Sequence, residues 1–192
     1  MALAEAFARR GDRLELPDLN IPSFGRLTYS GMLAAVDALD TRSGEGRSWG
    51  LVGSSMGGWV AARWAELHPE RVTKLLLLAP GLDLPRRWRQ LLSEAEVREW
   101  ERTGWREVAD AAGVPTKLHW DLMEDAFKQP PLPRPACPVL VIHGGRDEVV
   151  PVSVSEAWAA GQPNVTLEVV DDDHSLMASL PHIERQALSW LA

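Results

Sequence analysis

The chain has 192 residues, of which 45% are hydrophobic, and its formal net charge is −7. This size suffices for one substantial core and is short for two domains, so we expect a single domain over residues 1–192. The acidic balance, with a pI near 5.2, argues against contacts to a phosphate backbone, and we expect no nucleic-acid partner.

Targeting signals are not evident in the sequence. The first ten residues lack the basic start and apolar core of a signal peptide, and no apolar run approaches the ~20 residues that a membrane span requires. The lone Cys137 cannot form an internal disulfide, and its place before Pro138 at the start of an apolar strand predicts a packing role. We therefore expect a cytoplasmic protein with no membrane span.

The chain opens with a predicted helix and a short predicted strand. Leu3 and Phe7 share a helical face that ends at Gly11. Residues 14–16 then alternate like a short strand, which Pro17 stops.

The next elements lead to the most informative part of the sequence. Apolar residues at helical spacing predict a helix over residues 33–39, and the polar turn 43–46 ends it. An apolar strand follows over 49–52, and a helix over 59–67 stops before Pro69, because proline forbids its continuation.

Two continuously apolar segments, 72–79 and 138–143, are typical of parallel strands covered on both faces. A helix that begins at Pro151, a strand over 164–170 and a closing helix over 179–191 complete the pattern. Helices between such strands imply right-handed crossovers, so the fold class is α/β, a mostly parallel sheet flanked by helices.

The segment 81–135 has a different composition. It contains charged, tryptophan-bearing stretches with helical character and ends in the proline-rich run 129–135. We expect a small helical cap inserted into the domain. The tryptophans of this segment either pack a small subdomain or line an apolar pocket.

Residues 53–58 read Gly-Ser-Ser-Met-Gly-Gly and lie where a strand gives way to a helix. This context predicts a nucleophile elbow, in which glycines two positions before and after a serine allow a turn that exposes its hydroxyl. Ser55 has glycine at both offsets, whereas Ser54 does not. Because the pattern occurs by chance in roughly one such chain in fifteen, the alternative is an ordinary glycine-rich turn.

An aspartate and a histidine follow at the ends of two later strand-like segments. Asp147 follows the apolar segment 139–142, and His174 follows the segment 165–170 and three aspartates. The order serine, aspartate, histidine is the one found in α/β-hydrolases and differs from the chymotrypsin and subtilisin orders. Because a serine hydroxyl needs a base, and that base needs an orienting carboxylate, we expect Ser55, His174 and Asp147 to act together.

Several other residues compete for these roles. Asp83 is a second candidate for the acid, although Gly144 and Gly145 free the backbone to place Asp147. The run 171–173 adjoins His174, but neighbours on an extended segment tend to point apart, and we interpret these aspartates as a solvated loop. The other four histidines are expected to be packed or solvated; they are His68, His119, His143 and His182.

Metal and cofactor chemistry finds little support in the sequence. A metal site at 171–174 would need further ligands at suitable spacing, and no His/Cys cluster supplies them. We expect no cofactor. The oxyanion formed when Ser55 attacks an acyl carbon needs aimed donors, and the backbone N–H of Met56, at the start of the elbow helix, is the first.

Taken with its flanking motifs, the sequence resembles a small bacterial α/β-hydrolase and is similar to YqiA-like esterases. The segments that carry the resemblance are 17–20, 53–58, 79–80, 143–147 and 173–174. The resemblance implies Ser55 as nucleophile, Asp147 as acid and His174 as base. It also implies cofactor-free hydrolysis of carboxylic esters, with thioesters as a variant.

The chain departs from this family at its start. Members usually begin with an apolar strand and a His-Gly loop that lends the second oxyanion donor, whereas this sequence begins at the helix that follows them. Losing one such donor typically costs ~10²- to 10³-fold in turnover, so we expect weak activity. The uncovered sheet could also encourage pairing of chains into a homo-oligomer.

Two functions therefore compete. The first is a serine esterase for small or medium acyl esters. The second is a catalytically weak or dead member of the same fold that binds a ligand or partner through its pocket.

Overall fold

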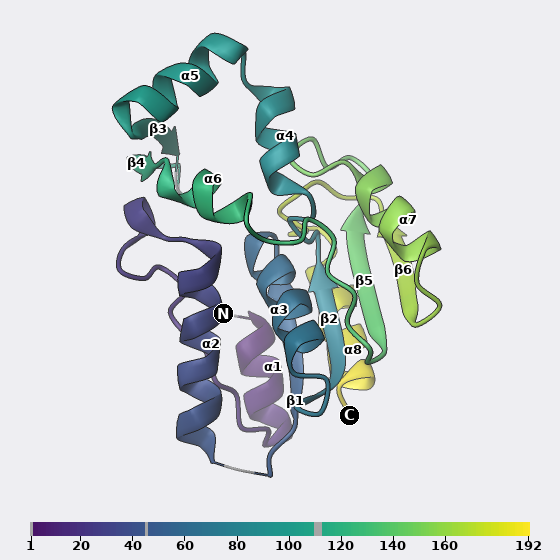
Figure 1. Cartoon of the computed structure of the whole chain (residues 1–192). Coiled ribbons are helices and arrows are strands. Elements are labelled where there is room, and N and C mark those ends of the chain that lie inside the picture. The colour runs from purple at the N-terminus through teal and green to yellow at the C-terminus, as the bar shows by residue number, and fades with distance from the viewer. Residues whose placement is uncertain (1, 45, 110–112) are drawn as a thin grey trace. The chain divides into compact units, whose positions relative to one another are not determined.

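The computed structural model describes residues 2–44, 46–109 and 113–192, and its contacts divide the chain into two compact units (Figure 1). The first unit comprises Met1–Leu16, Gly46–Leu82 and Leu132–Ala192. The second comprises Pro17–Glu45 and Asp83–Pro131. Most of the predicted cap segment thus belongs to a unit that also includes residues 17–45, and the single-domain interpretation stays a prediction.

In the described part of the first unit, four parallel strands form the sheet (Figure 1). In order across the sheet they are β1 (Trp49–Ser54), β2 (Val72–Leu78), β5 (Val139–Gly144) and β6 (Val165–Val170). Strand β5 is buried at every position, as expected for a parallel strand between two helical layers. The predicted α/β fold with a mostly parallel sheet is confirmed.

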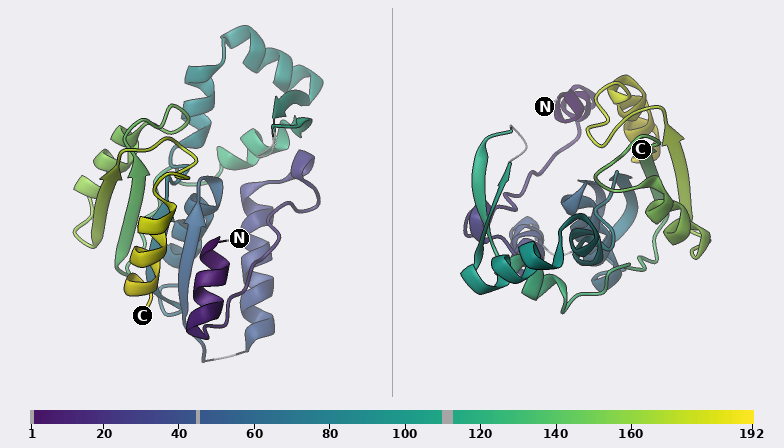
Figure 2. Two further views of the ribbon diagram at one scale, coloured as in Figure 1. Left: turned by 180° about the vertical axis from the view of Figure 1, so that it is seen from behind. Right: turned by 90° about the horizontal axis from the view of Figure 1, so that it is seen from above.

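Helices cover both faces of this sheet (Figure 2). They are α1 (Ala2–Arg10), α3 (Met56–Leu67), α7 (Val152–Ala160) and α8 (Leu180–Trp190). Helix α3 packs on β1 and β2, and α7 packs on β5 and β6, while α1 and α8 contact each other on the opposite face. The helices and strands predicted for this unit are confirmed apart from the segment 14–16.

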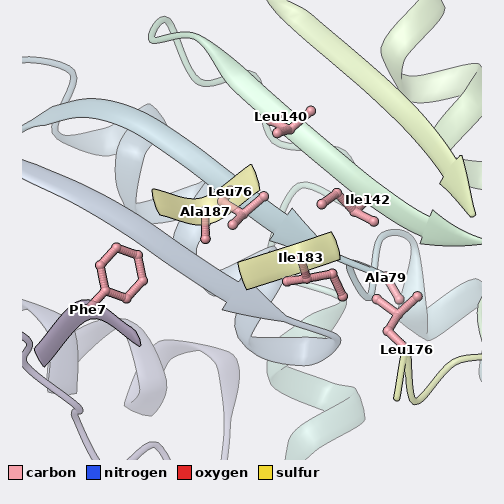
Figure 3. Packing of buried hydrophobic residues seen from close by; sticks show 8 residues of the cluster. All are labelled: Phe7, Leu76, Ala79, Leu140, Ile142, Leu176, Ile183 and Ala187. Carbon is pink, nitrogen blue, oxygen red and sulfur yellow. The ribbon is translucent and has the colours of Figure 1, made fainter. Parts of the chain in front are cut away.

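A cluster of buried apolar side chains joins α1 and α8 to the two central strands (Figure 3). Its members are Phe7, Leu76, Ala79, Leu140, Ile142, Leu176, Ile183 and Ala187. Phe7 is only 4% exposed, which makes the first helix part of the core. The cluster therefore holds the central strands β2 and β5 against the helices behind them.

The second unit contains helices and a two-stranded antiparallel hairpin. Its elements are η1 (Phe24–Arg26), α2 (Tyr29–Ser43), α4 (Leu84–Leu91), α5 (Glu94–Thr103), β3 (Trp105–Ala109), β4 (Pro115–His119) and α6 (Asp121–Ala126). The helical expectation for residues 81–135 therefore holds for α4, α5 and α6. It misses the hairpin, whose first strand, β3, alternates between exposed and half-buried residues.

Tryptophans form the centre of this second unit. The buried Trp100 contacts Trp88 and Trp120 edge-on, with ring centroids 5.4 and 5.3 Å apart. Its indole N–H donates to the carbonyl of Leu118 at 3.0 Å, so its polar group is satisfied inside the core. Of the two roles considered for these tryptophans, packing of a subdomain is therefore the one that Trp100 serves.

The short strand predicted over residues 14–16 is wrong, because these residues lie outside any strand in the structure. Leu16 is 77% exposed and Leu14 is 38% exposed, so their alternation serves no buried face. A three-residue extended segment needs a neighbouring strand to be stabilised as one. Cys137, by contrast, is buried as predicted, and burial raises the pKa of its thiol.

Candidate active site

Ser55 joins β1 to α3 in a strained backbone conformation. Its φ of 49° and ψ of −122° are unusual for a residue with a side chain and cost energy that the surroundings must offset. The end of β2 holds this peptide: the Ser55 N–H donates to the carbonyl of Leu78 at 2.9 Å, and the N–H of Gly81 donates to the Ser55 carbonyl at 2.7 Å. Main-chain hydrogen bonds thus fix the serine at the carboxyl edge of the sheet.

The glycines around Ser55 are required by close packing. A Cβ atom at Gly53 would overlap the carbonyl oxygen of Gly57. A Cβ atom at Gly58 would lie 2.9 Å from the Cβ of Pro80, which follows the neighbouring strand. The turn can therefore be this sharp only where these side chains are absent.

The structure brings the three sequence-predicted side chains together. His174 Nε2 lies 3.0 Å from the Oγ of Ser55, and His174 Nδ1 lies 2.7 Å from Oδ2 of Asp147. An ionised carboxylate can only accept, so Nδ1–H donates to Asp147 and leaves the Nε2 lone pair facing the serine hydroxyl. The three residues follow β1, β5 and β6, whose carboxyl ends meet at one edge of the sheet.

Asp147 is held from several directions, and its side chain is fully buried. Its Oδ1 accepts hydrogen bonds from the N–H groups of Val149 and Val150, at 2.9 and 2.8 Å. Its Oδ2, which accepts from His174, also lies 3.2 Å from Nε2 of His143. The carboxylate is therefore fixed by neighbours on both sides, as a buried charge requires.

The loop that carries Asp147 is bonded to the loop that carries His174. The N–H of Arg146 donates to the carbonyl of Asp172 at 2.9 Å, and the Arg146 guanidinium pairs with the carboxylate of Asp171. A Cβ atom at Gly144 would lie 2.5 Å from the carbonyl oxygens of both Asp172 and Asp173. The two loops therefore pack backbone against backbone, and this contact sets the position of His174 relative to Asp147.

The solvated-loop interpretation of residues 171–173 is wrong for Asp172, which is 4% exposed, although Asp171 and Asp173 are exposed. The Asp172 carboxylate accepts from the N–H groups of Asp173 and Ser179, both at 2.8 Å. Burial alone would raise its pKa, but these hydrogen bonds outweigh burial, and the pKa of Asp172 lies below its usual value. The alternation of side chains along an extended segment could not predict that Asp172 is buried, because its partners are backbone amides of the loop that follows.

The competing candidates have other partners. Asp83 lies 3.8 Å from Arg86, and burial raises the pKa of its carboxyl. Three of the other histidines are engaged as follows: His68 stacks on Trp64, His119 lies 2.9 Å from Asp121, and His182 lies 2.7 Å from Glu168. The fourth, His143, is completely buried. Among the described histidines, His174 is therefore the one that contacts the hydroxyl of Ser55.

Met56 begins helix α3 directly after the serine. As the first amide of a helix, its N–H has no intrahelical partner and lies at the positive end of the helix dipole. Its use as an oxyanion donor stays a prediction. Metal ligation has no candidate in residues 2–44, 46–109 and 113–192, because no group of three or more His, Cys, Asp or Glu side chains there could hold an ion.

One known family matches most of the chain. Residues 2–187 match the alpha/beta hydrolase family. The chain belongs to the α/β-hydrolase family. Across the described residues, no helix is both long and apolar enough to cross a membrane.

Curated proteins named palmitoyl-protein thioesterase ABHD10, mitochondrial, are among the relatives of this chain. The protein of Pongo abelii is 30% identical over 138 residues, which cover 65% of this chain and 42% of that protein. The protein of Rattus norvegicus is 30% identical over 110 residues, which cover 53% of this chain and 36% of that protein. The matched region thus spans less than half the length of these relatives.

Solved structures of hydrolases resemble the fold. A putative hydrolase from Agrobacterium vitis S4 superposes with a TM-score of 0.74 at 27% identity, covering 86% of this chain and 69% of that one. The alpha/beta hydrolase domain-containing protein 10 from mouse gives a TM-score of 0.70 at 24% identity, covering 84% and 68% of the two chains. The second likeness supports the fold alone.

Proposed function

We propose that this protein is a serine hydrolase that cleaves small or medium acyl esters or thioesters through an acyl-enzyme on Ser55. The observation that carries the proposal is the continuous path of two hydrogen bonds, 3.0 and 2.7 Å long, from Ser55 through His174 to Asp147. Serine hydroxyls that lie within reach of an imidazole oriented by a buried carboxylate are suited to nucleophilic attack.

In the first half of the reaction, Nε2 of His174 takes the hydroxyl proton as the Oγ of Ser55 attacks the acyl carbon. Asp147 stabilises the imidazolium through the Nδ1–H hydrogen bond. The tetrahedral oxyanion accepts a hydrogen bond from the backbone N–H of Met56, which lies at the positive end of the α3 dipole. Collapse expels the alcohol or thiol, which receives the proton from His174, and leaves Ser55 acylated.

In the second half, His174 removes a proton from water as the water oxygen attacks the acyl carbon. Collapse of this second tetrahedral intermediate breaks the bond to Ser55 Oγ, releases the carboxylic acid, and returns the proton from His174 to Ser55. No cofactor takes part in this scheme.

The choice between esters and thioesters is open to direct test. Curated relatives are named as thioesterases, which supports including thioesters, while the sequence resemblance to YqiA-like proteins supports carboxylic esters. We propose that nitrophenyl esters of increasing acyl length and matched acyl thioesters will give measurable rates. A rise in kcat/KM with acyl length, followed by a fall, would define the acyl class.

The decisive experiment uses a fluorophosphonate probe that labels activated serines. We expect labelling of the parent chain at Ser55, none in Ser55→Ala, and weak labelling in His174→Ala, because the hydroxyl then lacks its base. Ser54→Ala is the matched control and should label like the parent. A folded parent chain that resists the probe and hydrolyses no ester would favour the non-catalytic binding protein instead.

The proposal also includes location and assembly. We propose action in the cytoplasm on a small-molecule substrate, although the curated relatives are named as mitochondrial. We also retain the proposal of a homo-oligomer, since β1 lies at an edge of the described sheet. Fractionation of the native cell and light scattering of the purified protein test these two statements.

A further inference from the structure

A buried polar pair lies behind the proposed acid. His143, near the end of β5, and Ser155, in α7, are both completely inaccessible to solvent. His143 Nδ1 lies 2.8 Å from the Oγ of Ser155, and Nε2 lies 2.8 Å from the carbonyl oxygen of Val150. The proposed reaction uses neither side chain. Burying these polar groups costs free energy unless they form hydrogen bonds, so their contacts need an explanation.

These contacts determine where the His143 ring carries its proton. A backbone carbonyl can only accept, so Nε2 must be the protonated nitrogen that donates to Val150. A neutral ring then leaves Nδ1 as an acceptor for the hydroxyl of Ser155. Both ring nitrogens then have a hydrogen-bond partner.

The same ring nitrogen also lies close to the proposed acid. Nε2 lies 3.2 Å from Oδ2 of Asp147, the oxygen that also accepts from His174. In addition, Val150 is held through both of its backbone groups. Its carbonyl accepts a hydrogen bond from His143, and its N–H donates to Oδ1 of Asp147. His143 therefore lies against one carboxylate oxygen and supports the position of the other through the turn that follows Asp147.

We propose that His143, fixed in its Nε2–H form by Ser155, is a positioning residue that orients the Asp147 carboxylate toward His174. This inference rests on the proposed function, because positioning matters to rate only if Ser55 is a nucleophile. His143 touches neither Ser55 nor substrate, so it is not a catalytic residue. Its contribution is the angle and distance of the hydrogen bond between Asp147 and His174.

Variants at position 143 distinguish the effect of the His143 N–H group from the effect of its side-chain volume. In His143→Leu the side chain keeps a similar volume but loses the N–H. We expect kcat to fall by about 10²-fold with KM nearly unchanged, because a misplacement of the catalytic groups by about 1 Å can have this effect. In His143→Gln the side-chain amide can again donate toward Val150 and Asp147, and we expect kcat within about tenfold of the parent. Equal losses in both variants would overturn the proposal.

A matched control distinguishes this effect from a weakened core. Val141 lies in the same strand and is also completely buried, but its side chain makes no polar contact. Val141→Ala should lower the melting temperature while leaving kcat close to that of the parent. A loss of kcat in Val141→Ala as large as in His143→Leu would mean that general loosening of β5, and not positioning, explains the result.

A measurement that does not need turnover keeps the proposal independent of the proposed activity. The Nδ1–H proton of His174, hydrogen-bonded to a carboxylate, should give a low-field NMR signal in the parent and in Ser55→Ala. We expect this signal to persist in His143→Gln and to shift or broaden in His143→Leu. If the signal is unchanged in His143→Leu, the proposal fails. If it changes as expected while Ser55 remains unlabelled by the fluorophosphonate, the positioning is right and the hydrolase is wrong.

Ser155→Ala provides a second variant in case His143→Leu does not fold. Without the hydroxyl, Nδ1 of His143 loses its donor, and the ring is less firmly oriented. We expect a smaller fall in kcat, about tenfold or less, with the nitrogen shifts of His143 altered. Unchanged nitrogen shifts together with unchanged kcat would contradict the role assigned to Ser155.

Discussion

At the scale of single residues, the proposed site is a line of three side chains whose protonation is set by their partners. Asp147 can only accept, so it selects the Nδ1–H form of His174 and leaves Nε2 free for Ser55. In Asp147→Asn the amide group can donate, and the imidazole is then favoured in the opposite tautomer. We expect kcat to fall by about 10⁴-fold with KM little changed.

The measurement for this prediction is steady-state hydrolysis of the best nitrophenyl ester, with Asp171→Asn as the control. Asp171 is exposed and does not contact His174, so its replacement should cost less than tenfold. Comparable losses in the two variants would argue against Asp147 as the orienting acid.

The carboxylate of Asp172 is expected to make the free energy of unfolding depend on pH in the acidic range. Its folded-state pKa is lowered by hydrogen bonds from Asp173 and Ser179, so the unfolded chain binds this proton more readily than the folded one. Its contribution is therefore complete above the unfolded value near 3.9 and is lost as the pH falls through the folded value. Asp172→Asn should lower the melting temperature at pH 7 and flatten its decline between about pH 5 and 3.

This effect is checked by thermal unfolding across that pH range. Asp18→Asn, which changes a carboxylate of the second unit, is the comparison variant. If the melting temperatures of Asp172→Asn and the parent decline in parallel on acidification, the hydrogen bonds to Asp172 do not carry this share of stability.

At the scale of elements, two adjacent glycines in the loop after β5 should differ sharply in their tolerance of a methyl group. In Gly144→Ala the new Cβ would meet two carbonyl oxygens at 2.5 Å, so the loops that hold Asp147 and His174 must separate. In Gly145→Ala the nearest atoms lie at 3.4 Å, which is an ordinary contact. We expect Gly144→Ala to reduce kcat by at least about 10²-fold and Gly145→Ala to stay within about threefold.

Both glycine variants are compared by kcat and by melting temperature. A Gly144→Ala protein with parental kcat would show that the contact between the two loops does not set the geometry of His174. A severe loss in Gly145→Ala would point to loop flexibility, and not to steric fit, as the reason for the paired glycines.

The elements that the sequence predicted correctly are those with long apolar runs or clear stops. The leucine run of β2 and the proline after α3 leave few alternatives, because a parallel sheet buries both faces and proline ends a helix. Residues 14–16 show the converse: alternation over three residues carries no information about whether a partner strand is present. The hairpin of β3 and β4 was missed because its strands lie in a charged segment.

The site shows the same division. The order of Ser55, Asp147 and His174 could be read from the sequence, because each follows a recognisable strand. The supporting residues could not: Asp172, His143 and Ser155 act through hydrogen bonds whose partners lie in turns, loops and a following helix, and their side chains follow no periodic pattern.

At the scale of the whole molecule, the first helix is part of the core of the first unit. Phe7 packs in the cluster formed with α8 and the central strands (Figure 3). Removing a buried phenyl ring leaves a cavity, so Phe7→Ala should cost about 3–5 kcal/mol of the free energy of unfolding. Glu5→Ala on the exposed side of the same helix should change it by less than about 0.5 kcal/mol.

Denaturant unfolding of the two variants measures these values, provided that the m-value is unchanged. A Phe7→Ala protein as stable as the parent would mean that α1 is not anchored to the sheet in solution.

The backbone carbonyl of Leu78 and the backbone N–H of Gly81 hold Ser55 in its strained conformation. The end of strand β2 thus shapes the proposed site without contributing any recognisable sequence motif to it. A comparison of sequences alone would assign this stretch to hydrophobic packing and overlook it. For protein engineers, it follows that apolar replacements of Leu78 can repack the core while the backbone anchorage of the proposed nucleophile is preserved.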